Sequence, residues 1–264
     1  MAQTEPDIDT YTIPIQPNIR EISPADLKDV LVKGWDDFTA MPTFAIFLVV
    51  IYPILGVVIF SATFRQNLFP LIFPLIAGFA LLGPLAAVGL YEMSRRREQN
   101  LDISLTSLNF LRSPAIGSIL LLGVVLLAIF TAWLGAAQTI YTAIFGTPIQ
   151  TPSIDEFVTQ VFTTSEGWTL IIVGCGVGFV FALVAFAISA VSFPMILDRN
   201  VSVQTAVITS VKAVAANPGT MAIWGIIVAG ALFIGSLPFF VGLIVVLPVL
   251  GHSTWHLYCR LIER

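Results

Sequence analysis

The sequence predicts an all-α membrane protein with six transmembrane helices arranged as three hairpins. Hydrophobic residues make up 57% of the chain and charged residues only 11%, well below the roughly 25% of soluble domains. The mean hydropathy is +0.93. The apolar residues form long runs without the period-two alternation of transmembrane strands, so helices are the expected spanning elements.

Six apolar runs are each close to the roughly 20 residues that cross a hydrocarbon layer about 30 Å thick. We place them at about 43–62, 68–91, 115–138, 168–192, 219–237 and 239–258. The breaks at 65–67 and 235–238 are short enough to force antiparallel hairpins.

The basic residues predict the orientation of these spans. With a cytoplasmic N-terminus, 11 of the 12 Lys and Arg residues fall on the cytoplasmic side and Arg65 alone falls outside. Both ends are therefore predicted to be cytoplasmic. Residues 1–22 are polar and acidic without an apolar core, so they are predicted to be a disordered tail and not a signal peptide. Residues 23–264 are predicted to form one membrane domain.

An internal repeat precedes the odd-numbered spans. Segments at 23–42, 104–114 and 202–218 each begin with Ser and end with Pro. In the first, Ser23 can cap a helix that starts at Pro24. We expect its apolar face to hold Leu27, Val30, Leu31, Trp35 and Phe38, opposite Asp26, Asp29, Lys33, Asp36 and Asp37. These segments are predicted to be amphipathic helices in the cytoplasmic interface.

The long outer segment at 138–167 contains a further predicted helix. Ser153 with Glu156 three residues later forms a capping-box pattern ahead of an amphipathic stretch. This helix is interpreted as a lipid-facing cap, and a docking surface for a partner remains an alternative.

Seven short motifs occur in order along the chain. They are residues 34–38, 83–84, 89–92, 94–96, 197–199, 216–218 and 247–258, which read GWDDF, GP, GLYE, SRR, LDR, ANP and LPVLGHSTWHLY. With these motifs, the chain from about Ile22 to Leu261 resembles a bacterial family of integral membrane proteins of unknown function (domain of unknown function 2189). The resemblance implies a bacterial inner membrane, with the chain as a multi-pass protein, and it lends no activity.

His252 and His256 are the only histidines, and their spacing places both on one helix face. They could share a metal with Glu92 or Asp198 as a third ligand. The preferred interpretation is that both form hydrogen bonds at the membrane interface, so no metal or cofactor is predicted.

The remaining polar residues favour structural pairing. Glu92 can pair with Arg95 or Arg96, and Asp198 with Arg199. No span has an ionisable residue in its central third, which counts against an ion-coupled transporter. Ten residues are candidates for interaction or structural pairing: Trp35, Asp36, Asp37, Glu92, Arg95, Asp198, Arg199, His252, Trp255 and His256.

Two features of the spans leave alternatives open. Pro70, Pro74 and Pro84 should bend the second span. Two interpretations of the bend are open: kinked packing against neighbouring helices, or the lining of a substrate path. The glycines at 174, 176 and 178 allow close helix approach, inside the protein or to a partner.

Nucleophile elbows, phosphate-binding loops and paired catalytic carboxylates are missing from the sequence. The leading hypothesis is therefore a non-catalytic accessory or assembly subunit that contacts membrane lipids or another inner-membrane protein, without nucleic acid. The alternatives are a small-solute or lipid transporter or channel, and a metal-dependent enzyme at His252 and His256.

Overall fold

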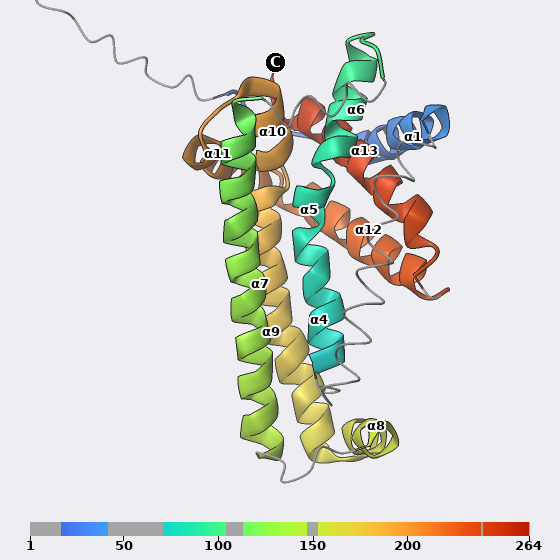
Figure 1. Cartoon of the computed structure of the whole chain (residues 1–264), viewed down its shortest axis with the longest axis vertical. Coiled ribbons are helices and arrows are strands. Elements are labelled where there is room, and N and C mark those ends of the chain that lie inside the picture. The colour runs from blue at the N-terminus through green and yellow to red at the C-terminus, as the bar shows by residue number, and fades with distance from the viewer. Residues whose placement is uncertain (1–16, 42–70, 104–112, 147–152, 239, 264) are drawn as a thin grey trace, which may run out of the picture.

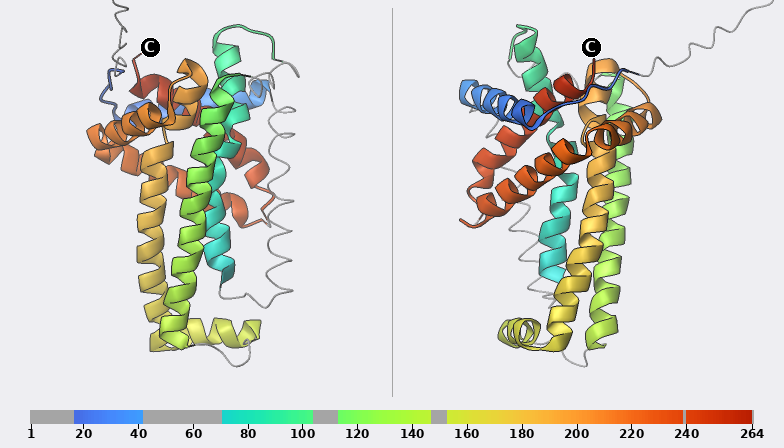
Figure 2. Two further views of the ribbon diagram at one scale, coloured as in Figure 1. Left: turned by 60° about the vertical axis from the view of Figure 1, so that its left-hand side comes forward. Right: turned by 180° about the vertical axis from the view of Figure 1, so that it is seen from behind.

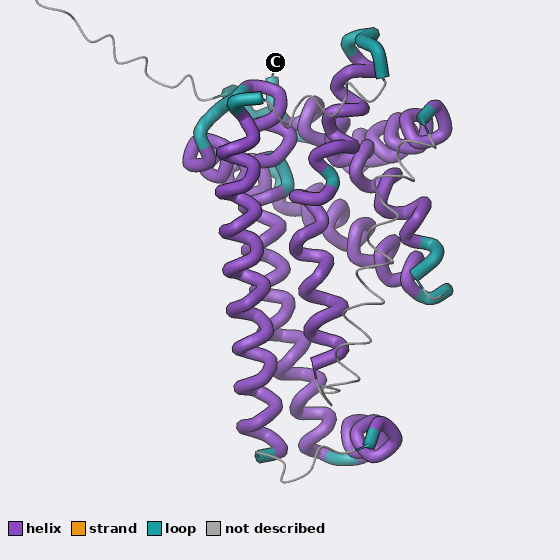
Figure 3. Tube along the Cα trace, in the orientation of Figure 1, coloured by secondary structure: helices purple, strands orange, loops and turns teal. Residues whose placement is uncertain are grey.

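The computed structural model describes residues 17–41, 71–103, 113–146, 153–238 and 240–263. Within them the chain is all-helical apart from one isolated bridge between Ile19 and Ile262, which confirms the predicted class. Figure 3 shows short loops between these helices. The first predicted span at 43–62 and most of the interfacial segment at 104–114 lie outside the described residues.

Two long helices form the axis of the molecule. α7 (Ala115–Phe145) and α9 (Ser165–Ser189) run side by side in every view of Figures 1 and 2. At 31 residues, α7 is about 46 Å long. The short helix α10 (Ser192–Arg199) follows α9 at one end, and α8 (Ile154–Thr163) lies across the other end. The predicted capping box is present, because the Ser153 side chain accepts from the Glu156 amide and Glu156 accepts from the Ser153 amide.

The predicted second span is interrupted. It consists of α4 (Ile72–Phe79), the 3₁₀ turn η2 (Ala80–Leu82), α5 (Gly83–Ala86) and α6 (Val88–Glu98). Pro84 lies in the first turn of α5, where a missing amide donor is tolerated. The prolines and glycines of this span therefore break it into short helices that change direction beside α7.

Four further helices gather at one end of the long pair. They are α1 (Pro24–Ala40), α11 (Val203–Ala216), α12 (Pro218–Ser236) and α13 (Leu243–Leu261). α1 packs along α13, and α12 and α13 form a hairpin that is tilted away from α7. The turn of this hairpin lies part-way along α7, well short of α8 (Figures 1 and 2).

The end where these helices meet holds large core side chains, with Phe193, Trp224, Trp255 and Tyr258 fully buried. We call it the basic end, because it carries Arg95, Arg96, Arg97, Arg199 and Arg260. Hydrogen bonds join segments here that are distant in the sequence. The Arg20 amide donates to the Leu261 carbonyl (2.8 Å), and the Ile22 amide donates to Oδ1 of Asn217 (2.7 Å).

Among the described residues, four helical stretches are long and apolar enough to cross a membrane. They are Ile72–Glu98, Ala115–Phe145, Ser165–Arg199 and Pro218–Ser236. The structure thus supports a membrane protein with several apolar helices. Six spans in three hairpins remain a prediction, because the first lies outside the described residues and α13 is not among the four.

Candidate functional site

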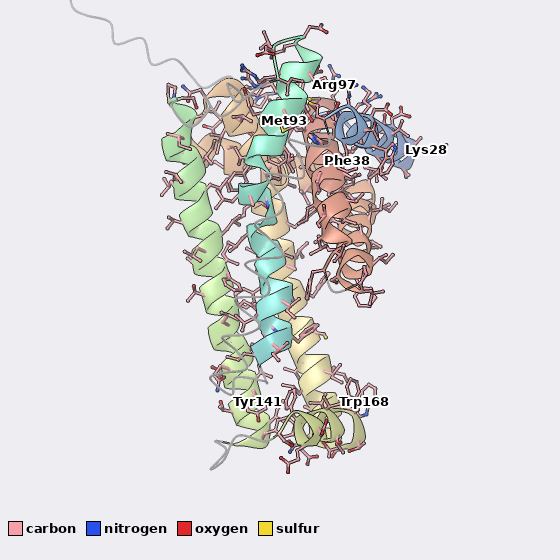
Figure 4. The ribbon with its side chains drawn as sticks, turned by 45° about the vertical axis from the view of Figure 1, so that its right-hand side comes forward. Lys28, Phe38, Met93, Arg97, Tyr141 and Trp168 are labelled. Atoms are coloured by element: carbon pink, nitrogen blue, oxygen red, sulfur yellow. The ribbon has the colours of Figure 1, made fainter. Side chains whose placement is uncertain are left out.

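The ten candidate residues all lie on four helices of the basic end, namely α1, α6, α10 and α13. Figure 4 labels Phe38 of α1 and Met93 and Arg97 of α6 at this end. Two glycines let these helices approach closely. A Cβ atom at Gly34 would overlap Ser253 of α13, and one at Gly251 would lie 2.5 Å from Cδ1 of Leu90 on α6. α13 is therefore held between α1 and α6 with almost no space between the helices.

Asp37 is the centre of a buried polar cluster between α1, α6 and α13. Its side chain is nearly inaccessible, and the residue is 4% exposed. Oδ2 accepts hydrogen bonds from Oγ of Ser94 (2.6 Å) and from Nε2 of His256 (2.8 Å). Oδ1 accepts a charge-assisted hydrogen bond from the Arg97 guanidinium. One carboxylate thus joins α1 to both neighbouring helices.

His252 extends this cluster by one further hydrogen bond. Its Nδ1 lies 2.8 Å from Oγ of Ser94, and the residue is 0% exposed. Because the single hydroxyl proton of Ser94 is donated to Asp37, Nδ1 of His252 must carry a proton and donate to Ser94. Its Nε2 is buried and has no hydrogen-bond partner among the described residues.

The environment keeps Asp37 ionised. Burial raises the pKa of the Asp37 carboxyl, but hydrogen bonds from His256, Ser94 and Arg97 and the charge of His256 outweigh it. The pKa consequently lies below the ordinary value of 3.8. Asp37 therefore carries a full negative charge at neutral pH and forms an ion pair with Arg97.

Glu92 and Arg95 form the pair that their spacing predicts. Nε of Arg95 lies 2.8 Å from Oε2 of Glu92, and Nη2 lies 3.0 Å from Oε1. Arg96 adds a longer contact of 3.7 Å. Glu92 is buried and its two arginines face the rim of the basic end, so the carboxylate is neutralised by its own helix.

Asp198 and Arg199 both bond to the side chain of Tyr258. The Tyr258 hydroxyl donates to Oδ2 of Asp198 (2.8 Å) and accepts from Nε of Arg199 (3.2 Å). Arg199 also donates to the carbonyl of Glu263. These bonds tie α10 to the end of α13, an arrangement that links residues about 60 positions apart and has no signal in the local sequence.

The structure corrects the predicted face of the first interfacial helix. Trp35, expected on its apolar face, is 51% exposed, whereas Asp37, expected on the polar face, is buried. Asp36 is exposed and lies outside the cluster. The buried side of α1 is rotated because α13 packs against Gly34. Only this glycine, within the motif at 34–38, could have indicated the rotation.

The two histidines do not converge on a shared ion. His252 points to Ser94 and His256 to Asp37, and the described residues contain no group of three His, Cys, Asp or Glu side chains that could hold a metal. Trp255, between them on α13, donates from Nε1 to Oε2 of Glu98 (3.2 Å). The cluster is thus built to join helices.

A second candidate site is an apolar groove between α4, α7 and α9, with a volume of about 220 Å³. Trp133 is among its lining residues, and its Nε1 donates to the Pro74 carbonyl (2.9 Å), so the one polar group of the ring is occupied. Of the second-span residues proposed for a path, Gly78 lines the groove, Pro74 and Pro84 are not among its lining residues, and Pro70 lies outside the described residues. The other lining residues include Phe73, Phe179 and Phe181.

The outward face of α9 is a third feature. Only Gly167, Ala185 and Ser189 of this 25-residue helix are buried. Ile172, Gly176, Val180 and Leu183 follow one another at helical spacing and are all exposed. Apart from the adjoining residues and backbone of α9 itself, no described atom lies within 4 Å of a Cβ built at Gly176.

With this geometry established, a comparison with protein families gives one match. Residues 72–198 match the model of a family described as "Predicted integral membrane protein (DUF2189)". This segment, just under half of the chain, is similar to members of that family. The family match extends from α4 to α10, so it includes Glu92, Arg95 and Asp198. A search of curated proteins and of solved structures found no match.

The DUF2189 match covers less of the chain than the resemblance suggested. The motifs at 34–38 and 247–258, which supply Asp37, His252 and His256, lie outside it. The buried polar cluster thus joins one helix of the matched segment, α6, to two helices that flank it in sequence, α1 and α13.

Proposed function

We propose that this protein is a non-catalytic integral protein of the bacterial inner membrane, an accessory or assembly subunit that binds a transmembrane helix of another protein through α9. The observation that carries the proposal is the outward face of α9. Gly176 lies at its centre, and Ile172, Val180 and Leu183 flank it. In a bilayer, helices associate where small residues let their backbones approach closely.

The shape of this face favours a helix over lipid as its partner. A glycine between large apolar side chains leaves a hollow on the helix surface, and a ridge of a facing helix can enter it. A Cβ at Gly178 would contact Trp133, and Gly174 lines the groove. Gly176 does neither.

The polar cluster supports a structural role for the basic end. Asp37, Ser94 and His252 are buried and engage one another, and Glu92 is paired with arginines of its own helix. These bonds fix α1, α6 and α13 in place. A basic end made rigid by these bonds would keep the α7–α9 pair in a fixed orientation for binding a partner.

The proposed membrane and orientation rest on the basic residues. Arg95, Arg96, Arg97, Arg199 and Arg260 all lie at the basic end, and α8, with Asp155 and Glu156 in its first turn, lies at the opposite end. By the positive-inside rule, we place the basic end and both termini in the cytoplasm.

Site-specific photo-crosslinking in native membranes tests the proposed face. A photoreactive amino acid replaces Val180, which is 56% exposed, or Val124 of α7, which is 61% exposed and lies at a similar distance from the basic end. We expect one protein adduct of defined mass from position 180 and none from position 124. Equal adducts from both positions, or none from either, would contradict the proposal.

Two glycine variants provide a matched control for this experiment. Gly176→Leu fills the hollow and should abolish the adduct from position 180. Gly135→Leu on α7 also enters open space and should leave it intact. Loss of the adduct in both variants would show that the effect comes from disturbed insertion and would remove the support for the α9 face.

A second candidate function, a lipid transporter, is favoured by the apolar groove at Trp133. Its lining offers no charged group among the residues that form it, which fits an acyl chain and not a polar solute. Transfer of a fluorescent phospholipid between vesicle leaflets by the reconstituted protein would test this role. A transfer rate equal to that of protein-free vesicles would contradict lipid transport, and the groove would then be only a gap in the packing of the helices.

A further inference from the structure

The α12–α13 hairpin presents an apolar tip that no other described helix covers. Phe233, Ile234, Leu237 and Val241 at this tip are each at least 60% exposed. No Asp, Glu, Lys, Arg or His occurs from residue 218 to residue 251. A turn that reaches water on the far side of a membrane normally carries polar residues, because connecting backbone there is solvated.

The depth of the tip distinguishes this hairpin from the α7–α9 pair. Both start and end at the basic end, but the α12–α13 turn lies part-way along α7 while α8 marks the opposite end (Figures 1 and 2). With 19 residues, α12 is only about 28 Å long, and its tilt shortens the depth that it reaches. A hydrocarbon layer is about 30 Å thick.

The backbone of the turn is suited to an environment without water. The amides of Leu237, Phe240, Val241 and Leu243 donate to carbonyls within the hairpin at 3.0–3.3 Å. The Ser236 hydroxyl donates to the Phe233 carbonyl (2.8 Å). Each backbone polar group left without a partner in hydrocarbon costs several kcal/mol, so these internal bonds lower the cost of placing the turn there.

The turn is also closed tightly, so water has little room inside it. A Cβ built at Gly242 would lie 2.7 Å from the carbonyl oxygen of Gly235, and one at Gly235 would lie 3.0 Å from Leu243 and Val246. These close contacts hold α12 and α13 against each other at the tip.

From these observations we infer that the α12–α13 hairpin is re-entrant: it enters the bilayer from the basic end, turns within the hydrocarbon and returns. Its tip contacts lipid acyl chains of the leaflet at that end. Leu237 and Val241 then lie among acyl chains, and α13 returns to the basic end where His252 and Trp255 enter the core. The two termini keep the side predicted for them.

Cysteine accessibility tests this inference on the full-length protein. In a background with Cys175→Ala and Cys259→Ala, three single variants are compared: Leu237→Cys at the tip, Glu156→Cys on α8 and Lys28→Cys on α1. A membrane-impermeant maleimide is applied to intact spheroplasts and to inside-out vesicles. The two marker variants should react from opposite sides, and Leu237→Cys should react from neither until detergent is added.

A spin label attached at Leu237→Cys gives an independent measure of depth. We expect collisions with dissolved oxygen to exceed those with a polar nickel complex, whereas the label at Glu156→Cys should show the reverse. Labelling of Leu237→Cys from the same side as Glu156→Cys would show two full spans. Labelling from the same side as Lys28→Cys would show a hairpin lying on the surface. Either result would overturn the inference.

Discussion

Replacing Asp37 with Asn tests whether the buried carboxylate holds α1 to its neighbours. The variant keeps the size of the side chain but removes its charge, and its amide group would face the N–H donor of His256 or the Arg97 guanidinium. Removing one member of a buried ion pair lowers the free energy of unfolding by about 3–5 kcal/mol. Because the Arg97 side chain is 39% exposed and partly hydrated, we expect about 3 kcal/mol, the lower end.

The expected change can be read as a shift of the unfolding temperature in detergent micelles. For a chain of this size 1 kcal/mol corresponds to roughly 2–4 °C, so Asp37→Asn should lower the midpoint by about 6–12 °C at a fixed scan rate. Asp36→Asn is the matched control, because Asp36 is the exposed neighbour on the same helix. Its expected effect is within about 0.5 kcal/mol. Equal shifts for the two variants would refute the role assigned to Asp37.

Three further predictions concern the same end of the molecule. Gly34→Ala should lower the unfolding temperature, because the added methyl group would overlap Ser253. Gly117→Ala on α7, where a methyl group enters open space, should leave the unfolding temperature unchanged or raise it. A rise for Gly34→Ala would contradict the close approach of α1 and α13. Tyr258→Phe should lower the free energy of unfolding by about 1.5–3 kcal/mol, because the tyrosine hydroxyl bonds two charged groups. The variant should also speed carboxypeptidase digestion of the C-terminus. An unchanged digestion rate would show that the hydroxyl is dispensable. The folded-state pKa of Asp37 is depressed, so its stabilisation should be complete above about pH 4 and disappear as the pH falls through that lower pKa. The difference in unfolding temperature between wild type and Asp37→Asn should then stay constant from about pH 5 to 8, and narrowing within that range would indicate that another group titrates.

Local signals in the sequence predicted the elements that depend on local chemistry. The Ser23 and Ser153 starts of α1 and α8 follow from hydrogen bonds within four residues of the chain, and both helices begin where expected. The interrupted second span follows equally directly from its prolines. Such features require no knowledge of what packs against them.

The buried cluster could not be predicted because its members come from three distant helices. A helical projection of α1 placed Asp37 with the other acidic residues, and only the approach of α13 at Gly34 places it inside. Tertiary packing therefore decided where Asp37 lies.

The packing of α1 on α13 has a consequence for biogenesis. α1 precedes α13 and the bridge at Ile262 in the sequence, so it leaves the ribosome before them. The long helices can enter the translocon one after another, but Asp37 has no access to His256 until α13 has been synthesised. Closure of the basic end therefore has to wait for α13, and a nascent chain truncated before α13 would leave Asp37 without this partner.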